Sequence, residues 1–144
     1  MFVKEKYKNA IFLIDGSSLL YRAYYGLRAL YTSSGVPTQA IYGFCRAIKK
    51  LIDDFDPKHI VLVWDSKGKT FRSDMFSEYK ATRQSPPSDL FEQKKSIVEF
   101  SSLIGLCQVS EQGYEADDLL FSIVEDYKKD EIVLVGPDKD LHQM

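Results

Sequence analysis

The two most apolar segments of the chain are short, and an aspartate directly follows each of them. AIFLI at residues 10–14 precedes Asp15, and IVLVW at residues 60–64 precedes Asp65. Continuous apolar runs of this length predict strands that are buried on both faces. Residues 132–135 form a further run, and residues 107–109 predict a shorter strand. Because helical patterns separate these runs, the sequence predicts an α/β fold with a mostly parallel central sheet and helices on both faces.

Four helices are predicted from apolar residues at helical spacing. The first follows an N-cap at Ser17 or Ser18 and ends near Leu30. The other three run from Thr38 to about Phe55, from Ser88 to about Leu106 and from Glu115 to about Lys129. In the third helix the residues expected to face inward are Leu90, Phe91, Ile97, Phe100, Leu103 and Ile104. Residues 66–87 show no clean period, which indicates a loop or an irregular helical segment.

The composition limits the class of protein. A chain of 144 residues with 44% hydrophobic and 28% charged residues is typical of one globular domain. Its apolar runs are far shorter than the ~20 residues that a membrane span needs, and the first ten residues hold no apolar h-region. Cys45 and Cys107 are expected to be buried free thiols. We therefore expect a cytoplasmic protein that makes no membrane contact. A monomer is expected as well.

Charge is segregated along the chain. Residues 111–144 hold 10 acidic and 3 basic side chains, whereas the stretch 66–83 is basic. The cations of that stretch are Lys67, Lys69, Arg72, Lys80 and Arg83. A solvated, mixed surface explains much of such a pattern in most proteins. The functional alternative is a basic strip that meets a polyanion, beside an acidic pocket that holds cations.

Carboxylates gather where ligands bind in parallel sheets. Asp15, Asp65 and Asp138 each follow a predicted strand, and Asp140 lies two residues further on. The carboxyl ends of parallel strands meet at one edge. Glu115, Asp117 and Asp118 open a predicted helix. Any one of these acids can be explained as a turn former or as a partner of the helix dipole. As a set they favour a site for Mg²⁺ or Mn²⁺, and a pair of such ions can drive phosphodiester hydrolysis.

Aromatic and basic residues alternate in the middle of the chain. Phe71, Arg72, Phe76, Tyr79, Lys80 and Arg83 could contact unpaired nucleotides, since aromatics stack on bases and cations neutralise phosphates. The alternative is that the two phenylalanines belong to the core. Arg22 could clamp a phosphate, or it could form a partly buried ion pair with one of the acids.

Six linked motifs follow one another along the chain, namely Leu13–Ser18 with Tyr21–Ala23, Gln39–Phe44, Val63–Asp65 with Lys69–Arg72, Tyr79–Arg83, Gly113–Asp118 and Asp138–Leu141. Together they resemble the 5′-nuclease domain at the N-terminus of bacterial DNA polymerase I, a relative of flap endonucleases. Their order and spacing run through nearly the whole chain.

The resemblance implies a PIN-like fold and a metal-dependent 5′-3′ exonuclease and 5′-flap endonuclease of DNA replication and repair. The expected partners are DNA 5′ ends, flaps or nicks, with no small-molecule cofactor. In the family, the positions matching Asp15, Asp65, Glu115, Asp117, Asp118, Asp138 and Asp140 bind the metals. Those matching Lys80 and Arg83 act on the scissile phosphate. Arg22, Arg72 and Tyr79 join them as expected DNA-binding residues.

The chain departs from the family pattern at two places. Pro137 stands where the family usually has Gly or Ala, which could alter the loop that aims Asp138. The chain also ends at Met144, before the remaining metal-site aspartates, the helix-hairpin-helix region and the polymerase. We therefore expect residues 1–144 to be the N-terminal part of a 5′-3′ exonuclease domain with an incomplete two-metal site and weak or no activity alone. A vestigial metal- and DNA-binding module is the alternative, and a phosphatase-like α/β domain is a more distant one.

Overall fold

A parallel sheet forms the centre of the molecule. The computed structural model describes residues 2–68, 70–75 and 84–136, and in them four strands pair in the order β3-β2-β1-β4, all parallel. The strands are β1 (Ile11–Asp15), β2 (His59–Val63), β3 (Cys107–Val109) and β4 (Ile132–Val135). The last two have the predicted bounds, and the first two differ from prediction by one residue. The predicted α/β class with a parallel sheet is confirmed.

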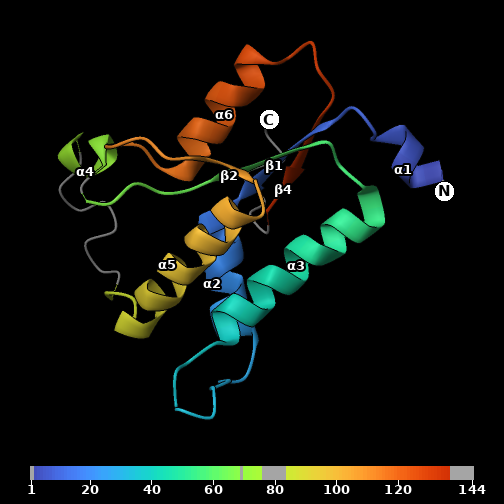
Figure 1. Ribbon diagram of the computed structural model, residues 1–144. Helices are drawn as coiled ribbons and strands as arrows, with labels where there is room; N and C mark the ends of the chain where they lie inside the picture. The colour runs from blue at the N-terminus through green and yellow to red at the C-terminus, as the bar shows by residue number, and fades with distance from the viewer. Residues whose placement is uncertain (1, 69, 76–83, 137–144) are drawn as a thin grey trace.

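Helices cover both faces of this sheet, as Figure 1 shows. They are α1 (Phe2–Lys6), α2 (Gly16–Gly26), α3 (Gln39–Phe55), α4 (Phe71–Met75), α5 (Ser88–Leu103) and α6 (Ala116–Asp126). Helices α2, α3 and α5 pack on one face, and α6 packs on the other. The short helix α4 lies in the segment for which the sequence predicted a loop or irregular helical structure.

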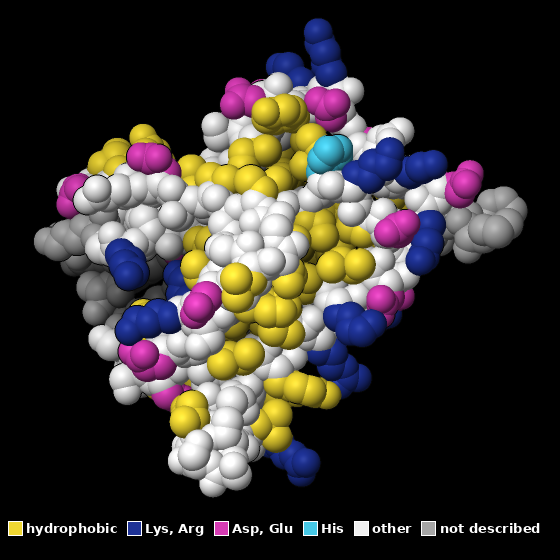
Figure 2. Space-filling view, viewed as in Figure 1, with side chains coloured by type: hydrophobic (Ala, Val, Ile, Leu, Met, Phe, Trp, Pro, Cys, Tyr) yellow, Lys and Arg dark blue, Asp and Glu magenta, His cyan; other side chains and the backbone are white. Residues whose placement is uncertain are grey.

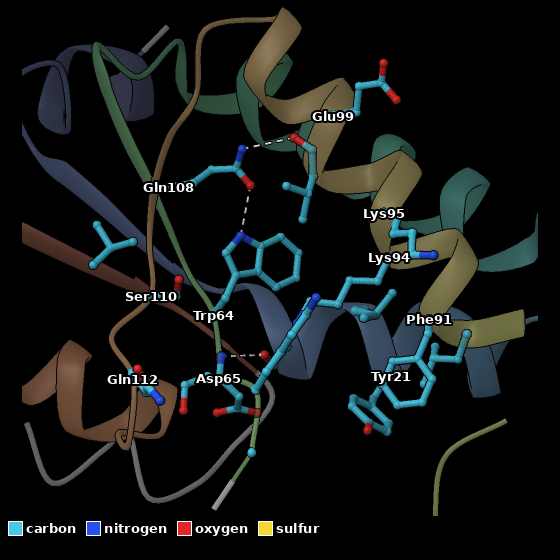
Figure 3. A pocket seen from close by; sticks show the side chains of 18 residues that line it. Tyr21, Trp64, Asp65, Phe91, Lys94, Lys95, Glu99, Gln108, Ser110 and Gln112 are labelled. Atoms are coloured by element: carbon cyan, nitrogen blue, oxygen red, sulfur yellow. Dashed lines mark hydrogen bonds between the residues drawn. The ribbon is translucent and has the colours of Figure 1, made fainter. Parts of the chain in front are cut away.

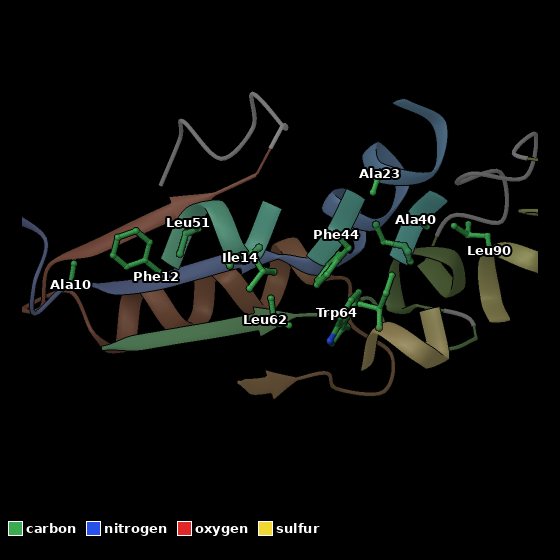
Figure 4. Packing of buried hydrophobic residues seen from close by; sticks show 13 residues of the cluster. Ala10, Phe12, Ile14, Ala23, Ala40, Phe44, Leu51, Leu62, Trp64 and Leu90 are labelled. Carbon is green, nitrogen blue, oxygen red and sulfur yellow. The ribbon is translucent and has the colours of Figure 1, made fainter. Parts of the chain in front are cut away.

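The alternation of side chains along the strands builds two cores. Phe12, Ile14 and Leu62 are fully buried against α2, α3 and α5, as Figure 4 shows. Leu13 and Val63 point to the other face, where they meet Ala116 and Leu120 of α6. Continuous apolar runs are needed because a parallel sheet covered on both faces has no solvent side. Ala116, at the start of α6, thus belongs to the same buried cluster as Val63 at the end of β2.

Trp64 anchors the end of β2 in the larger core. Its ring stacks on Phe44 with centroids 5.7 Å apart and an interplanar angle of 16°. A Cβ added at Gly16 would lie 3.0 Å from the Trp64 ring. A side chain at residue 16 would therefore press on the tryptophan. This close approach is the physical reason for a glycine directly after Asp15.

Helix α2 ends earlier than its apolar pattern predicts. The helix stops at Gly26, and residues 30–38 form a tight hairpin in which Thr38 N–H donates to Leu30 O at 2.8 Å. Thr32 N–H donates to Val36 O at 2.9 Å within the same hairpin. Leu30 was expected to lie in the helix, and that expectation is wrong. Hairpin hydrogen bonds satisfy the backbone here in place of the helical ones.

Helix α5 is held by two polar contacts, one buried and one partly buried. The Oε1 atom of Gln93 accepts a hydrogen bond from Ala40 N–H at 2.7 Å, at the start of α3. The Tyr24 hydroxyl donates to Asp89 at 2.9 Å and joins α2 to α5. Burial, together with this carboxylate, raises the pKa of Tyr24 to about 12. The three helices on this face therefore form one rigid layer.

Only part of the predicted apolar face of α5 is buried. Leu90 and Ile97 are in the core, but Phe91, Leu103 and Ile104 are exposed, and Leu103 is 81% exposed. The prediction that these three face inward is wrong. The edge strand β3 is only three residues long, so it offers little surface that could bury a wider face of this helix.

The two cysteines are less buried than the sequence predicts. Cys45 of α3 is half-buried, and Cys107 is exposed on the edge strand β3. The prediction that both thiols are buried is therefore wrong.

The face shown in Figure 2 carries basic side chains beside acidic ones along α3, with hydrophobic side chains spread down its centre. Two exposed ion pairs, Lys49–Asp53 and Lys50–Asp54, lie on that helix. Exposed pairs of this kind contribute about 0.3–0.5 kcal/mol each. In the part of the chain that the structure describes, no helix is long and apolar enough to cross a membrane.

We expect Phe44→Ala to lower the free energy of unfolding by about 3–5 kcal/mol, because it removes a fully buried ring that supports Trp64. Urea denaturation followed by circular dichroism measures this. Tyr42→Ala is the matched control, because Tyr42 lies in the same helix and is 51% exposed. Equal losses in the two variants would contradict the assignment of this core.

Candidate active site

Asp15 is buried at the carboxyl end of β1 and caps α2. It is 2% exposed, and its two carboxylate oxygens accept hydrogen bonds from Ser18, one from the N–H at 2.9 Å and one from the hydroxyl at 2.7 Å. The sequence predicted Ser17 or Ser18 as the N-cap, and the structure assigns that place to Asp15. The helix dipole favours a negative charge here. The two hydrogen bonds hold the carboxylate in one orientation, and the dipole stabilises its charge.

Asp65 lies at the same edge of the sheet, on the neighbouring strand. Asp15 pairs with Val63 in the parallel register, so Asp65 follows two residues beyond that level. The Ser17 hydroxyl accepts a hydrogen bond from Asp65 N–H at 2.9 Å. Asp65 Oδ1 accepts one from Ala116 N–H at 2.7 Å, at the start of α6. The predicted convergence of Asp15 and Asp65 is therefore observed, and Asp65 also positions a third element.

The first turn of α6 carries the predicted acids. Glu115 is its N-cap and is 9% exposed. Glu115 and Asp118 form a capping box, in which Glu115 N–H donates to Asp118 Oδ2 at 3.0 Å. Capping boxes satisfy backbone donors that a helix start leaves without partners. Asp117 lies between them, half-buried.

Arg72 of α4 pairs with this acidic turn. Its guanidinium donates to both oxygens of Asp118, at 2.8 and 2.5 Å, and to Glu115 Oε2 at 3.3 Å. The arginine also lies over the ring of Phe71, 5.1 Å from its centroid. Bidentate pairs between arginine and carboxylate are among the stronger charge-assisted contacts. Arg72 was predicted to bind DNA, and in the structure its guanidinium faces the acids of α6.

The loops that carry these residues are joined by backbone hydrogen bonds. Phe71 N–H donates to Gly113 O at 2.9 Å, and Ser66 N–H donates to Tyr114 O at 3.3 Å. The ring of Phe71 packs on Tyr114 with centroids 5.6 Å apart. Phe71 is 39% exposed, so it is neither a fully buried core residue nor fully solvated. Helix α4 is thereby fixed to the loop before α6.

Five of the predicted site residues lie outside the described part of the chain. They are Tyr79, Lys80, Arg83, Asp138 and Asp140. Arg22 is described and is exposed on α2. Among the described residues no three His, Cys, Asp or Glu side chains are arranged to hold a metal ion. The acidic side chains at this edge, however, offer carboxylate oxygens as metal ligands. Hard divalent cations prefer oxygen ligands of this kind.

A pocket of about 1030 Å³ opens beside Asp65. It lies between α2, α5 and the segment that follows β3, and Figure 3 shows it from close by. Trp64 forms part of its wall, and the indole N–H of Trp64 donates to Gln108 Oε1 at 2.9 Å. The Lys94 ammonium lies 5.1 Å from the centroid of the Trp64 ring. Burial lowers the pKa of Lys94, although the charge of Asp65 opposes that shift.

A family model supports the resemblance seen in the sequence. The model described as "5′-3′ exonuclease, N-terminal resolvase-like domain" matches residues 10–144. The chain belongs to this family.

Relatives of the 5′-3′ exonuclease family match nearly all of the chain. It is 34% identical over 141 residues to a 5′-3′ exonuclease of Bacillus subtilis, covering 94% of this chain and 48% of that protein. It is 37% identical over 139 residues to the thermostable DNA polymerase I of Thermus aquaticus, covering 95% of this chain and 17% of that protein. The chain thus spans about half of the exonuclease and about a sixth of the polymerase.

Solved structures share the fold. The T5 D15 protein co-crystallised with metal ions superposes with a TM-score of 0.69 at 21% identity, over 91% of this chain and 50% of that one. The catalytic core of Rad2 in complex with DNA substrate gives 0.58 at 22% identity, over 96% of this chain and 42% of that one. The 5′-nuclease fold expected from the sequence is therefore confirmed for this member of the family.

Lys94 and Gln108 were not predicted as site residues. A lysine on an exposed helix pattern ordinarily indicates a solvated side chain, and nothing in the sequence places it over Trp64. The sequence therefore offers no signal that would have identified it. Only the packing of α5 across the end of β2 brings Lys94 to the pocket.

We expect Arg72→Met to lower the free energy of unfolding by about 1–3 kcal/mol, because it leaves Glu115 and Asp118 close together without this cation. Urea denaturation measures the change. Lys50→Met is the control, since it breaks an exposed ion pair and should cost less than about 0.5 kcal/mol. Indistinguishable losses would show that the Arg72 cluster contributes no more than a surface pair.

Proposed function

We propose that this chain supplies the carboxylate edge of a divalent-metal-dependent 5′-3′ exonuclease and 5′-flap endonuclease that hydrolyses DNA. The observation that carries the proposal is the placement of Asp15 and Asp65 at the ends of adjacent strands, with Asp65 hydrogen-bonded to the first turn of α6. The names of the relatives support the same activity, since they are 5′-3′ exonucleases and DNA polymerases I. The T5 D15 protein was co-crystallised with metal ions, and the catalytic core of Rad2 was solved in complex with DNA substrate.

The residues proposed to hold Mg²⁺ or Mn²⁺ are Asp15, Asp65, Glu115, Asp117 and Asp118, together with Asp138 and Asp140 beyond the described residues. Bound there, divalent cations would neutralise phosphate charge and make water a better nucleophile. The chain's own contribution is orientation. Ser18 holds the carboxylate of Asp15, and Ala116 N–H holds that of Asp65. Preorganised groups of this kind cost no rearrangement during the reaction.

Cationic residues complete the proposed site. Lys80 and Arg83 are proposed to neutralise the non-bridging oxygens of the scissile phosphate, and Arg22 and Tyr79 to contact DNA nearby. Arg72 is proposed to act mainly by holding the acidic turn of α6, because its guanidinium binds Asp118 through both nitrogens. Hydrolysis adds water across the bond between phosphorus and the 3′ oxygen. The expected substrates are DNA 5′ ends, flaps and nicks.

One observation favours a second candidate, a module that binds metal and DNA but does not cleave. Among the described residues the acids do not form a three-ligand group, and Glu115 and Asp118 are engaged with Arg72. Incubation with a labelled 5′-flap and Mn²⁺ separates the two functions when the chain is extended by the rest of the exonuclease domain that its relatives have, because residues 1–144 alone are expected to show weak or no activity. Cleavage supports the nuclease. Mn²⁺ binding without cleavage supports the second candidate.

We expect Asp65→Asn to reduce Mn²⁺-dependent flap cleavage by about 100-fold or more and to weaken Mn²⁺ binding in calorimetry. The asparagine oxygen can still accept the Ala116 hydrogen bond, so the fold should be preserved while the charge is lost. Asp54→Asn, at an exposed position on α3, is the control. Full activity of Asp65→Asn would contradict the proposed site.

Lys80→Ala should reduce flap cleavage by a larger factor than it weakens DNA binding, if Lys80 acts on charge that develops during the reaction. Single-turnover rates and fluorescence anisotropy with a labelled flap in EDTA measure the two quantities. Equal losses in both would make Lys80 an ordinary phosphate contact instead. Lys50→Ala serves as the control for a general loss of positive charge.

A further inference from the structure

Trp64 lies directly before Asp65, and its ring has neighbours on several sides. Phe44 of α3 stacks on the ring, and the Lys94 ammonium of α5 lies 5.1 Å from its centroid. Gly16 approaches so closely that a Cβ at that position would lie 3.0 Å from the ring. The tryptophan is 4% exposed. Because close-packed neighbours enclose the ring in this way, it cannot turn without displacing one of them.

Gln108 of the edge strand β3 binds the polar atom of that ring. The indole N–H of Trp64 donates to Gln108 Oε1 at 2.9 Å, as Figure 3 shows. From Nε2, Gln108 donates to Val98 O at 3.0 Å and to Ser102 Oγ at 2.9 Å, both on α5. Because the amide oxygen only accepts and the amide nitrogen only donates, these contacts fix which way the amide points. The ring is thereby held with its N–H toward Gln108.

Asp65 is joined to these contacts through the backbone. It follows Trp64 in the chain, and the main-chain N–H of Trp64 donates at 2.9 Å to the carbonyl oxygen of Val109, the residue after Gln108. On its other side, Asp65 Oδ1 accepts the hydrogen bond from Ala116 N–H at 2.7 Å. A continuous path of hydrogen bonds and covalent bonds thus runs from α5 through β3 and the end of β2 to the start of α6. A shift of the tryptophan would move the Asp65 carboxylate.

We propose that Gln108 is a positioning residue, which acts through the indole N–H of Trp64 to hold the Asp65 carboxylate in the orientation that Mg²⁺ requires. This role rests on the proposed function, in which Asp65 is a metal ligand. Mg²⁺ demands near-ideal octahedral geometry, whereas Ca²⁺ accepts flexible arrangements of oxygen ligands. Loss of the Gln108 contact therefore weakens Mg²⁺ binding more than Ca²⁺ binding. A contact that only stabilised the fold would not change the preference between the two ions.

The first test needs no metal. The chain contains one tryptophan, so a ¹⁵N-labelled sample gives one indole N–H signal. In EDTA, we expect Gln108→Met to shift that signal and to raise the hydrogen-exchange rate of the indole N–H by about fivefold or more. The Ala116 amide should shift as well, because its acceptor is Asp65. The Tyr127 amide, which donates to Ile123 O at the other end of α6, is the internal control and should be unchanged.

The second test is a titration with MgCl₂ and, separately, with CaCl₂, followed through the Ala116 amide signal. We expect Gln108→Met to weaken Mg²⁺ binding about fivefold and Ca²⁺ binding less than about twofold. Trp64→Phe keeps a ring against Phe44 but removes the N–H, so it should change the two affinities in the same way. The double variant should bind no more weakly than either single variant, because both substitutions remove one and the same contact.

Ser102→Ala is the matched control. It removes one acceptor of the Gln108 amide but leaves the contact with Trp64 in place. Because Ser102 is exposed, its Mg²⁺ affinity should stay within about twofold of that of the wild type. A loss equal to that of Gln108→Met would show that the contact with Trp64 is not what matters.

Other results would also overturn the positioning role. They are an unchanged Ala116 signal for Gln108→Met in EDTA, equal losses of Mg²⁺ and Ca²⁺ affinity, and additive losses in the double variant. Failure of the proposed metal site gives a different result, because neither ion would then shift the Ala116 amide of the wild type. In that case the spectra in EDTA still decide whether Gln108 positions Asp65.

Discussion

One hydrogen bond between distant parts of the chain determines the geometry of the site. Ala116 N–H donates to Asp65 Oδ1 at 2.7 Å across 51 residues of sequence. The backbone of Asp65 is joined to α2 through the Ser17 hydroxyl, so a single residue links the starts of α2 and α6 to the end of β2. Two helices on opposite faces of the sheet thereby present their first turns to the same edge. The acids of α6 lie where they do because of this link.

The distribution of charge at this edge follows from the same arrangement. Several carboxylates close together would repel each other unless positive groups or hydrogen-bond donors satisfied them. Ser18 donates twice to Asp15, and Arg72 donates to Asp118 and Glu115. The protein thus satisfies the inner acids from within, while Asp65 is exposed toward the pocket. This division of roles is consistent with a site that admits a cation and a phosphate from the pocket side.

The sheet and its acidic edge could be predicted because strand residues buried on both faces leave a plain pattern, and parallel strands end at one edge. Helix faces were harder. Phe91 and Leu103 fit an apolar stripe in α5, but a short edge strand covers too little of that helix to bury them. The partner of Arg72 could not be predicted, because α4 gives no periodic signal and its direction depends on backbone contacts to Gly113 and Tyr114. Lys94 acquires its place from packing alone.

The ends of β1 and β2, with the first turn of α6, are proposed to form one cation-binding edge. Nuclear magnetic resonance of ¹⁵N-labelled chain during a Mn²⁺ titration tests it most directly, because a paramagnetic ion broadens nearby amide signals first. We expect the amides of Ser18 and Ala116, which are hydrogen-bonded to Asp15 and Asp65, to broaden at substoichiometric Mn²⁺. Amides near Asp53 and Asp54 on α3 should broaden only in excess. Earlier or equal broadening on α3 would show that Mn²⁺ does not prefer this edge.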